Sequence, residues 1–172
     1  MDFRFVPPEL GKLDDVSAEL VACSIWQDER PLTGLAGLLD WRLAGRLSKL
    51  ARESFLAGQL GEVLFLPGRP RLPFDKVLVL GLGPRASFGD EPFREAVKRL
   101  VKTLDGLHVR RAVVELPGRG DDAVTPERAA ELVLEQVERL PDHDGWVLVE
   151  PAETQKRIAQ RAQDERRRSL HR

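Results

Sequence analysis

The fold class is decided by one stretch, Lys76-Val77-Leu78-Val79-Leu80-Gly81-Leu82-Gly83. Its continuous apolar run is typical of a strand buried on both faces, because a strand with one face in water alternates apolar and polar residues. The Gly-x-Gly turn that ends it is a place where α/β folds often hold anions. A helix-compatible segment opens soon afterwards, at about residue 91. The stretch therefore predicts a strand, a turn and a helix within a layered α/β domain.

The rest of the chain alternates strands with helices in the same way. We predict strands at residues 18–26, 62–66, 76–80, 111–116 and 145–150, and helices at 38–55, 91–104, 126–140 and from 152 onward. The short spacing between residues 66 and 76 excludes a crossover helix, so the two strands that it joins are predicted to form an antiparallel or locally paired set. We therefore expect a three-layer α/β/α sandwich around a mixed sheet of about five to six strands.

Length and composition fit an ordinary soluble globular protein, with 172 residues of which 42% are hydrophobic and 32% charged. We expect one domain over residues 1–152 and a charged C-terminal helix or tail over 153–172. The single cysteine, Cys23, excludes an internal disulfide and is expected to be a small buried side chain. The N-terminus lacks the apolar core of a signal peptide, and no apolar run approaches the roughly 18 residues that span a bilayer. These features predict a cytoplasmic protein without a membrane partner.

Charge is uneven along the chain. Seven basic and two acidic residues lie between Lys156 and the C-terminus, although the formal net charge of the whole chain is only −1. The candidates for contact with nucleic acid are Arg161, Arg166, Arg167 and Arg168. The alternative is a solvated helix end, which is the more usual role of an arginine-rich terminus. Nucleic acid is therefore not expected to be the main partner.

Several local patterns follow one another in a recognisable order. The early strand through Trp26 is followed by Phe55-Leu56-Ala57-Gly58-Gln59-Leu60-Gly61-Glu62, then by the stretch over 76–83, and then by Phe93-Arg94-Glu95-Ala96 in the next helix. Over roughly residues 16–150, this order and spacing resemble the N-terminal domain of the leucyl aminopeptidase (cytosol aminopeptidase) family. The corresponding family patterns are F-x-G-K-x-G-E, r-v-l-l-v-G-L-G and lR-x-A.

The resemblance implies a macrodomain-like α/β/α sandwich. In the full-length enzymes this domain precedes a catalytic domain that carries two metal ions. The motifs of that domain, among them an Asn-Thr-Asp-Ala-Glu-Gly-Arg segment, have no match in this sequence. We therefore expect a stand-alone version of the non-catalytic half that stops where the catalytic domain would begin, with no enzyme activity, catalytic residue, metal or cofactor. In the full-length family this half is associated with assembly of the hexamer and, in some members, with DNA contacts.

A macrodomain-like pocket would hold a nucleotide such as ADP-ribose at the turn after the strand over 76–80. The candidate ligand-binding residues are Gly81, Leu82, Gly83, Arg85 and Asp28. The loop amides and the Arg85 guanidinium would bind phosphate, and Asp28 follows the first strand. The alternative is that both glycines only permit positive φ and close backbone packing. The turn also satisfies G-x-G-x-x-A, but Pro84 separates it from the helix, so a classical dinucleotide site is not expected.

Other chemistry-bearing residues do not form a recognisable motif. The three histidines are scattered, and the carboxylates at positions 121, 122, 142 and 144 lack the spacing of metal ligands. The sequence contains no G-x-S-x-G and no GxxxxGK[ST] motif. Trp26, Trp41 and Trp146 lie on or beside apolar segments, where core or interface packing is expected.

Three hypotheses about function follow. The leading one is a non-catalytic binding or assembly module that pairs with itself, with a separately encoded catalytic protein or with another partner. The second is a macrodomain-type binder of ADP-ribose or a related nucleotide through the turn at 81–85. The third is DNA contact through the basic tail.

Overall fold

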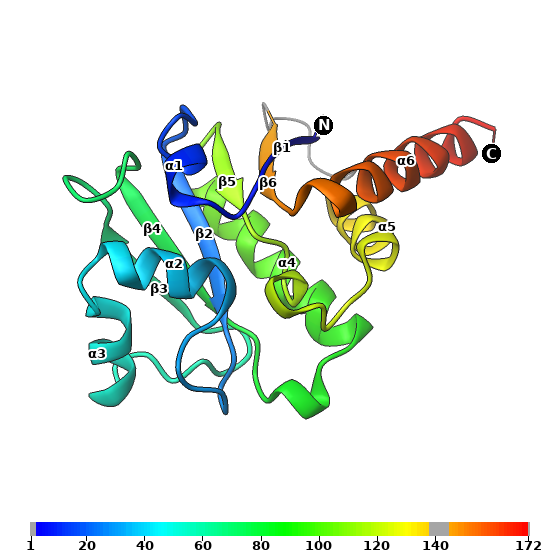
Figure 1. Ribbon diagram of the computed structural model, residues 1–172. Coiled ribbons are helices and arrows are strands. Elements are labelled where there is room, and N and C mark those ends of the chain that lie inside the picture. Colours follow the sequence, from blue (N-terminus) through cyan, green and yellow to red (C-terminus); the bar gives the residue numbers. More distant parts are fainter. Residues whose placement is uncertain (1–2, 138–144, 172) are drawn as a thin grey trace.

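A six-stranded sheet forms the centre of the protein in the computed structural model, which describes residues 3–137 and 145–171 (Figure 1). The strand order is β1-β6-β5-β2-β4-β3. The strands are β1 (Phe3–Val6), β2 (Leu20–Ile25), β3 (Val63–Pro67), β4 (Lys76–Gly81), β5 (Ala112–Val114) and β6 (Trp146–Val149). All neighbouring pairs are parallel except β3 and β4, whose antiparallel pairing agrees with the short connection between them.

Helices cover both faces of the sheet. They are α1 (Leu10–Leu13), α2 (Gly34–Arg42), α3 (Arg46–Arg52), α4 (Asp90–Gly106), α5 (Pro126–Val137) and α6 (Ala152–Ser169), with 3₁₀ turns η1 (Arg85–Ser87) and η2 (Arg119–Asp121). The helices α1 to α3 pack on one face through a cluster that includes Leu39 and Leu47. The helices α4 to α6 pack on the other through a cluster that includes Leu100, Val133 and Ile158. The predicted three-layer α/β/α sandwich with a mixed sheet is therefore confirmed.

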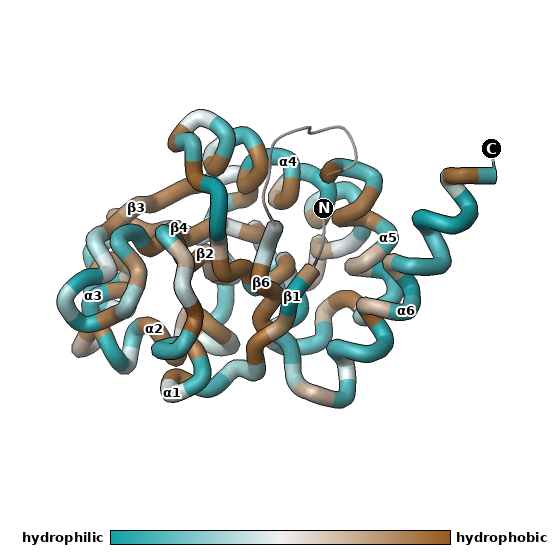
Figure 2. Tube along the Cα trace, turned by 90° about the horizontal axis from the view of Figure 1, so that it is seen from above, coloured by the Kyte–Doolittle hydropathy of each residue, from teal (hydrophilic) through white to brown (hydrophobic). Residues whose placement is uncertain are grey.

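The central strands are apolar throughout because both of their faces are covered. All six residues of β2 are buried, and in β4 only Lys76 is exposed. Figure 2 shows these hydrophobic strands between the helical layers and the mostly hydrophilic course of α6. The unbroken apolar run that decided the fold class thus lies where a doubly covered strand must lie.

The helix predicted over residues 38–55 is wrong in its bounds. The chain instead forms α2 and α3, which are separated by Ala44 and Gly45 in left-handed backbone conformations, with φ of 56° and 78°. The Asp40 carboxylate then accepts hydrogen bonds from the backbone amides of Leu47 and Ser48, at 2.8 and 3.1 Å. A buried carboxylate that satisfies the first amides of α3 makes the break stable. Apolar periodicity alone did not reveal it because both helices bury leucines on the same side.

One other element, the edge strand β1, differs from the prediction. The sequence does not predict the edge strand β1, because four residues that include an exposed arginine do not stand out from a loop. The helix predicted over 126–140 begins at Pro126 and is described as far as Val137, and residues 138–140 lie outside the described residues. The charged C-terminal segment forms α6, which buries Ile158 and Ala162. No helix in the described ranges is both long and apolar enough to cross a bilayer.

Candidate functional site

The loops after β2, β4 and β5 emerge at one edge of the sheet. The strands are parallel, and their register places Ile25 opposite Gly81 and Ala22 opposite Val114. The chain leaves β2 towards α2 on one face and leaves β4 towards α4 on the other face. Ligands of open α/β sheets bind outside the carboxyl ends of strands at such a reversal. This edge is therefore the first place to look for a site.

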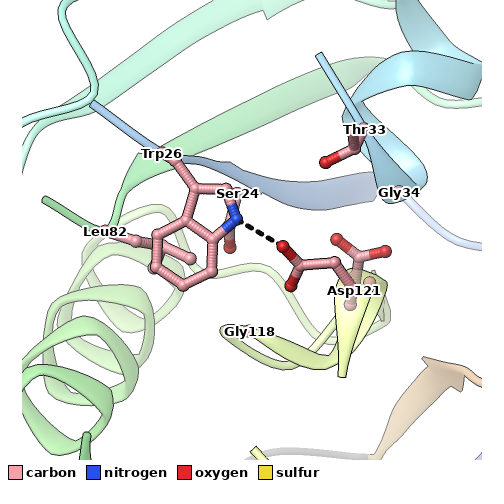
Figure 3. A pocket seen from close by; sticks show the side chains of 9 residues that line it. Ser24, Trp26, Thr33, Gly34, Leu82, Gly118 and Asp121 are labelled. Carbon is pink, nitrogen blue, oxygen red and sulfur yellow. Dashed lines mark hydrogen bonds between the residues drawn. The ribbon is translucent and has the colours of Figure 1, made fainter. Parts of the chain in front are cut away.

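A small crevice lies at this edge, and Figure 3 shows it from close by. Its lining residues are Ser24, Trp26, Thr33, Gly34, Leu82, Glu115, Gly118, Gly120 and Asp121. The free space between them has a volume of about 10 Å³. A space of that size holds about one water molecule. The crevice is therefore largely filled by the protein's own side chains.

Three residues, Trp26, Arg85 and Asp121, join the loops that line the crevice, and we call them the latch. The Trp26 indole Nε1 donates a hydrogen bond to Asp121 Oδ2 at 2.8 Å, which Figure 3 marks with a dashed line. The Arg85 guanidinium forms an ion pair with Asp121 and lies 5.7 Å from the centre of the Trp26 ring. Phe88 packs against the same ring edge-on, with centroids 4.9 Å apart. The latch ties the end of β2 to the loops that follow β4 and β5.

Glu115 is the buried acid of the crevice. The backbone N–H of Leu35, in the first turn of α2, donates to its Oε2 at 2.8 Å. A Cβ added to Gly34 or Gly120 would come within 2.9 or 2.8 Å of that same oxygen, so the carboxylate would have to shift if either residue carried a side chain. We call the space bounded by Leu35 N–H, Gly34 and Gly120 the carboxylate seat.

The environment raises the pKa of Glu115 to about 7, mainly because burial disfavours its charged form. The Leu35 amide and the Arg119 guanidinium oppose that shift, while the negative charges of Glu150 and Asp121 add to it. A carboxyl group that titrates near neutral pH can exchange a proton under ordinary conditions.

A second buried polar group faces the crevice. Ser24, at the end of β2, is 8% exposed, and within the described residues its hydroxyl has no hydrogen-bond partner. Ser24 and Glu115 were not among the predicted site residues. A signal was present for Glu115, because an acid that follows the apolar run Ala112–Val114 and precedes Pro117-Gly118 stands at the carboxyl end of a buried strand.

An ion pair lies beneath the crevice. Arg119 donates to both carboxylate oxygens of Glu150, at 2.8 and 3.0 Å, and both side chains are 1% exposed. Arg119 also donates to Asp122 and to the carbonyl oxygen of Val124, and the Thr154 hydroxyl donates to Glu150. Because the charges are paired and hydrogen-bonded, the pair fixes η2 against the junction of β6 and α6.

The predicted ligand-binding turn has a clear packing role. The amides of Gly81, Leu82 and Gly83 donate to the carbonyl oxygens of Glu62, Ile25 and Gly58, at 2.9, 3.0 and 2.9 Å. A Cβ on Gly81 would lie 2.0 Å from the carbonyl oxygen of Gln59, and Gly83 has a φ of 77°. These three amides are therefore already bonded to the chain, and an anion would have to displace a carbonyl to reach one of them.

The two remaining residues of that predicted site, Arg85 and Asp28, lie in contact with each other. The Arg85 amide donates to Asp28 Oδ1 at 3.1 Å, and the Arg85 guanidinium lies 3.6 Å from a carboxylate oxygen of Glu29. Of the five residues, Leu82 lines the crevice and Arg85 belongs to the latch. Ligand binding by this set stays a prediction.

The predicted nucleic-acid residues lie on α6. Arg161 forms ion pairs with Glu131 of α5, at 2.5 Å, and with Glu165, at 3.0 Å. Arg168 pairs with the same Glu165 at 2.9 Å, and Arg166 also has an interaction partner. Arg167 is exposed. Arg161 therefore ties α6 to α5, and DNA contact through these arginines stays a prediction.

The remaining expectations concern cysteine, tryptophan and metals. Cys23 is buried as expected, and burial raises the pKa of its thiol. Trp26 and Trp146 are buried, whereas Trp41 is 77% exposed and is not part of the core. Within the residues that the structure describes, no three His, Cys, Asp or Glu side chains group as metal ligands. The carboxylates at 142 and 144 lie outside those residues.

Comparison with known proteins connects this fold to a family of peptidases. Residues 20–140 match the model of the cytosol aminopeptidase family, N-terminal domain. A probable cytosol aminopeptidase of Halorhodospira halophila is 30% identical over 129 residues, which cover 72% of this chain and 26% of that protein. One of Pseudomonas fluorescens (strain SBW25) is 37% identical over 78 residues, covering 45% of this chain and 16% of its own length. The chain thus spans about a quarter or less of these curated relatives.

Solved structures with the same fold include macrodomains. The macrodomain of Thermus aquaticus DarG superposes with a TM-score of 0.66 and 18% identity, covering 87% of this chain and 99% of that one. A variant of the Oceanobacillus iheyensis macrodomain solved with ADPR gives a TM-score of 0.70 and 12% identity, covering 95% and 92%. At these identities the likeness shows a shared fold and no more.

Proposed function

The chain belongs to the cytosol aminopeptidase family through its N-terminal domain, and on that premise we propose that it is a non-catalytic binding and assembly module. Only the N-terminal domain of the family is matched, and the curated relatives are several times longer than the matched region. The observation that carries the proposal is the contrast between two places. The crevice at the carboxyl edge of the strands is filled, whereas the layer of α2 and α3 exposes large aromatic side chains.

The α2–α3 layer has the features of a protein-binding surface. Trp41, in α2, is 77% exposed, and Phe55, just after α3, is 70% exposed. Trp41 borders an open groove of about 480 Å³, which is also lined by Pro31, Leu32 and Ala44. Exposed aromatic residues beside a groove are enriched at interfaces, where they supply most of the binding energy. We call this groove, with Trp41 and Phe55, the α2–α3 surface.

Two partners fit this surface. One is a second copy of the chain, and the other is a separately encoded protein that carries the catalytic half of the family. Both would bury Trp41 and Phe55, whose present exposure is unfavourable in water. The aromatic surface therefore supports assembly, and the choice between the partners is a matter for experiment.

The molar mass of the protein, measured by light scattering as it elutes from a size-exclusion column, tests the assembly role. We expect a mass above the 19.3 kDa of one chain, either for the protein alone or after mixing with a cytosol aminopeptidase catalytic domain. Trp41→Glu should abolish the larger species, because it buries a charge in the interface. Leu170→Glu is the matched control, since Leu170 is 84% exposed at the far end of the molecule. A mass of one chain under both conditions, or equal behaviour of the two variants, argues against the proposal.

The proposal also requires that the protein does not hydrolyse peptides by itself. Leucine amide in the presence of manganese should show no turnover above buffer at micromolar protein. Turnover that rises in proportion to protein concentration and disappears with a chelator would refute a purely binding role.

A second candidate function is binding of a nucleotide such as ADP-ribose. It is favoured by the fold, since a macrodomain solved with ADPR is among the structural neighbours, and by the position of the crevice at the carboxyl edge of the strands. A ligand of that size would have to open the latch and displace Glu115. Calorimetric titration with ADP-ribose separates the two candidate functions. Saturable binding that Trp26→Ala alters would support nucleotide binding. No heat of binding at millimolar ADP-ribose would argue against nucleotide binding.

A further inference from the structure

We propose that the protein binds an acidic, extended segment of a partner protein along the outer edge of β3, beside the exposed face of α4. The segment adds a strand to the sheet and places its acidic side chains against Lys98, Arg99 and Lys102, which we call the α4 cations. This inference goes beyond the assembly role, because α4 covers the opposite face of the sheet from the α2–α3 surface. It is measured on the single chain, so either proposal can fail without the other.

The first support is the open backbone of β3, which ends the sheet and pairs only with β4 among the described strands. At the start of this pair, the Gly81 amide donates to the carbonyl oxygen of Glu62 at 2.9 Å. Hydrogen bonding alternates along an antiparallel pair, so Val63 and Phe65 direct their backbone N–H and C=O groups to the open side. An extended peptide can pair with these groups as an added strand.

The side chains at this edge also leave apolar surface uncovered. Val63 packs against the core cluster of the α4 layer and is only partly buried. Because side chains alternate between the two faces of a strand, Phe65 lies on the same side, and it is 41% exposed. A strand added beside β3 would cover part of this ring, which favours binding.

The second support is an open groove of about 740 Å³ on the exposed face of α4. Leu60 and Gly61, which lead into β3, line it together with the α4 cations. The groove therefore begins at the segment that enters the edge strand, and a partner seated on that edge reaches the helix.

The α4 cations are not neutralised by the protein itself. All three side chains are exposed, and within the described residues none forms an ion pair or a hydrogen bond. The neighbouring Arg94 differs, because it pairs with Glu91 at 2.6 Å and with Glu135 at 3.0 Å. Three uncompensated positive charges within five residues, in a chain whose formal net charge is −1, favour a partner with negative charge.

The cations of α4 and the edge residues of β3 lie at matching heights along the sheet. A Cβ added to Gly61 would lie 3.8 Å from Glu95 Oε1, so these two positions are neighbours. Because β4 and β5 both run parallel to β2, α4 runs back along the sheet in the direction of β3. Arg99 lies about 6 Å beyond Glu95 along α4. Val63 lies about 7 Å beyond Gly61 along β3, so an acidic side chain of an added strand at this height is within reach of the Arg99 guanidinium.

The two supports together favour a polypeptide over a nucleic acid. A peptide strand offers both donors and acceptors to the open edge, whereas a phosphate backbone offers acceptors only. Glu91 and Glu95 also line the groove, and they would repel a continuous run of phosphates. A peptide with acidic residues at alternate positions can meet the cations and avoid these two acids.

Fluorescence anisotropy with a labelled peptide of about nine residues, alternating glutamate and threonine, tests the proposal. At about 50 mM salt we expect saturable binding with a Kd below about 1 mM, and at least roughly tenfold weaker binding when lysine replaces glutamate. In the saturated complex, the backbone amides of Val63 and Phe65 should exchange at least about tenfold more slowly. Arg99→Glu combined with Lys102→Glu should raise the Kd about tenfold or more, since attraction becomes repulsion.

Lys12→Glu combined with Lys156→Glu is the matched control. It changes the net charge equally at exposed positions of α1 and α6, so the Kd should stay within about twofold. Equal affinity for the acidic and basic peptides, equal Kd values of the two double variants, or unchanged exchange at Val63 and Phe65 would each overturn the inference. Tighter binding of an oligothymidylate of similar charge would also overturn it, by assigning the surface to nucleic acid.

Discussion

At the scale of single residues, the most consequential one in this chain is Glu115, an acid at the end of a buried strand. Glu115 occupies a space that would otherwise be open at the carboxyl edge of the sheet, and two glycines leave room for it. The sequence shows the acid after an apolar run, yet it does not show that Gly34 and Gly120, 81 and 5 residues away from it in the chain, surround its carboxylate. Such a site depends on contacts between distant segments, which local patterns do not contain.

Glu115 should make stability depend on pH. Its pKa in the folded protein is about 7, above its ordinary value of 4.5, because burial outweighs the Leu35 amide and Arg119 while Glu150 and Asp121 add to the shift. A raised folded pKa means that the contribution of this group is fully present below about pH 4.5 and is lost as pH rises through 7. Relative to Glu115→Gln, the protein should lose roughly 3 kcal/mol of unfolding free energy between pH 5 and pH 8.

Urea unfolding of both proteins at the two pH values measures this difference. Using the difference between the variants cancels the titration of all other groups to a first approximation. An unchanged difference between pH 5 and pH 8 would show that Glu115 is not held in a desolvated environment.

Gly81 should be required for packing. A Cβ there would lie 2.0 Å from the carbonyl oxygen of Gln59, so Gly81→Ala must shift backbone and should lower the unfolding free energy by about 1–3 kcal/mol. Gly89→Ala is the control, because open space surrounds Gly89 and its extended backbone suits any residue. Chemical denaturation compares the two. Equal stabilities of Gly81→Ala and Gly89→Ala would contradict the packing role of the turn and would leave ligand binding as the explanation for its glycines.

At the scale of elements, patterns within one segment were predictable and breaks caused by tertiary contacts were not. The strand β4 and the helix α4 follow directly from an apolar run and from regular apolar spacing. The division between α2 and α3 depends on the Asp40 carboxylate and on left-handed residues at 44 and 45. The helical spacing of the leucines continues through this break and therefore does not reveal it. The latch was not predicted: Arg85 was a candidate phosphate partner, and the structure pairs it with Asp121.

The ion pair of Arg119 and Glu150 should hold η2 against the end of β6. Both side chains are 1% exposed, so Arg119→Ala leaves a buried carboxylate without its partner and should cost about 3–5 kcal/mol of unfolding free energy. Arg167→Ala, at an exposed position of α6, should change it by less than about 0.5 kcal/mol. Equilibrium unfolding in urea gives both values. A loss for Arg119→Ala as small as that of the control would mean that the pair is not buried in solution.

At the scale of the whole molecule, the sandwich has a filled crevice at the carboxyl edge of its strands and exposed aromatic side chains on the layer of α2 and α3. The family relationship and the macrodomain-like fold were accessible from sequence, because ordered motifs and an unbroken strand survive at 30–37% identity to the curated relatives. Which tryptophan is exposed was not predicted, because all three lie on or beside apolar segments, although Trp41 alone stands between two charged residues, Asp40 and Arg42. Only the packed structure distinguishes the buried tryptophans from the exposed one.

Hydrogen exchange of the backbone amides, measured as the protein passes from its monomeric to its assembled form, tests the central claim most directly. Assembly through the α2–α3 surface predicts slower exchange at residues 37–55, with the crevice loops and the exposed end of α6 unchanged. Protection confined to the crevice loops or to α6, with residues 37–55 exchanging as before, would contradict it.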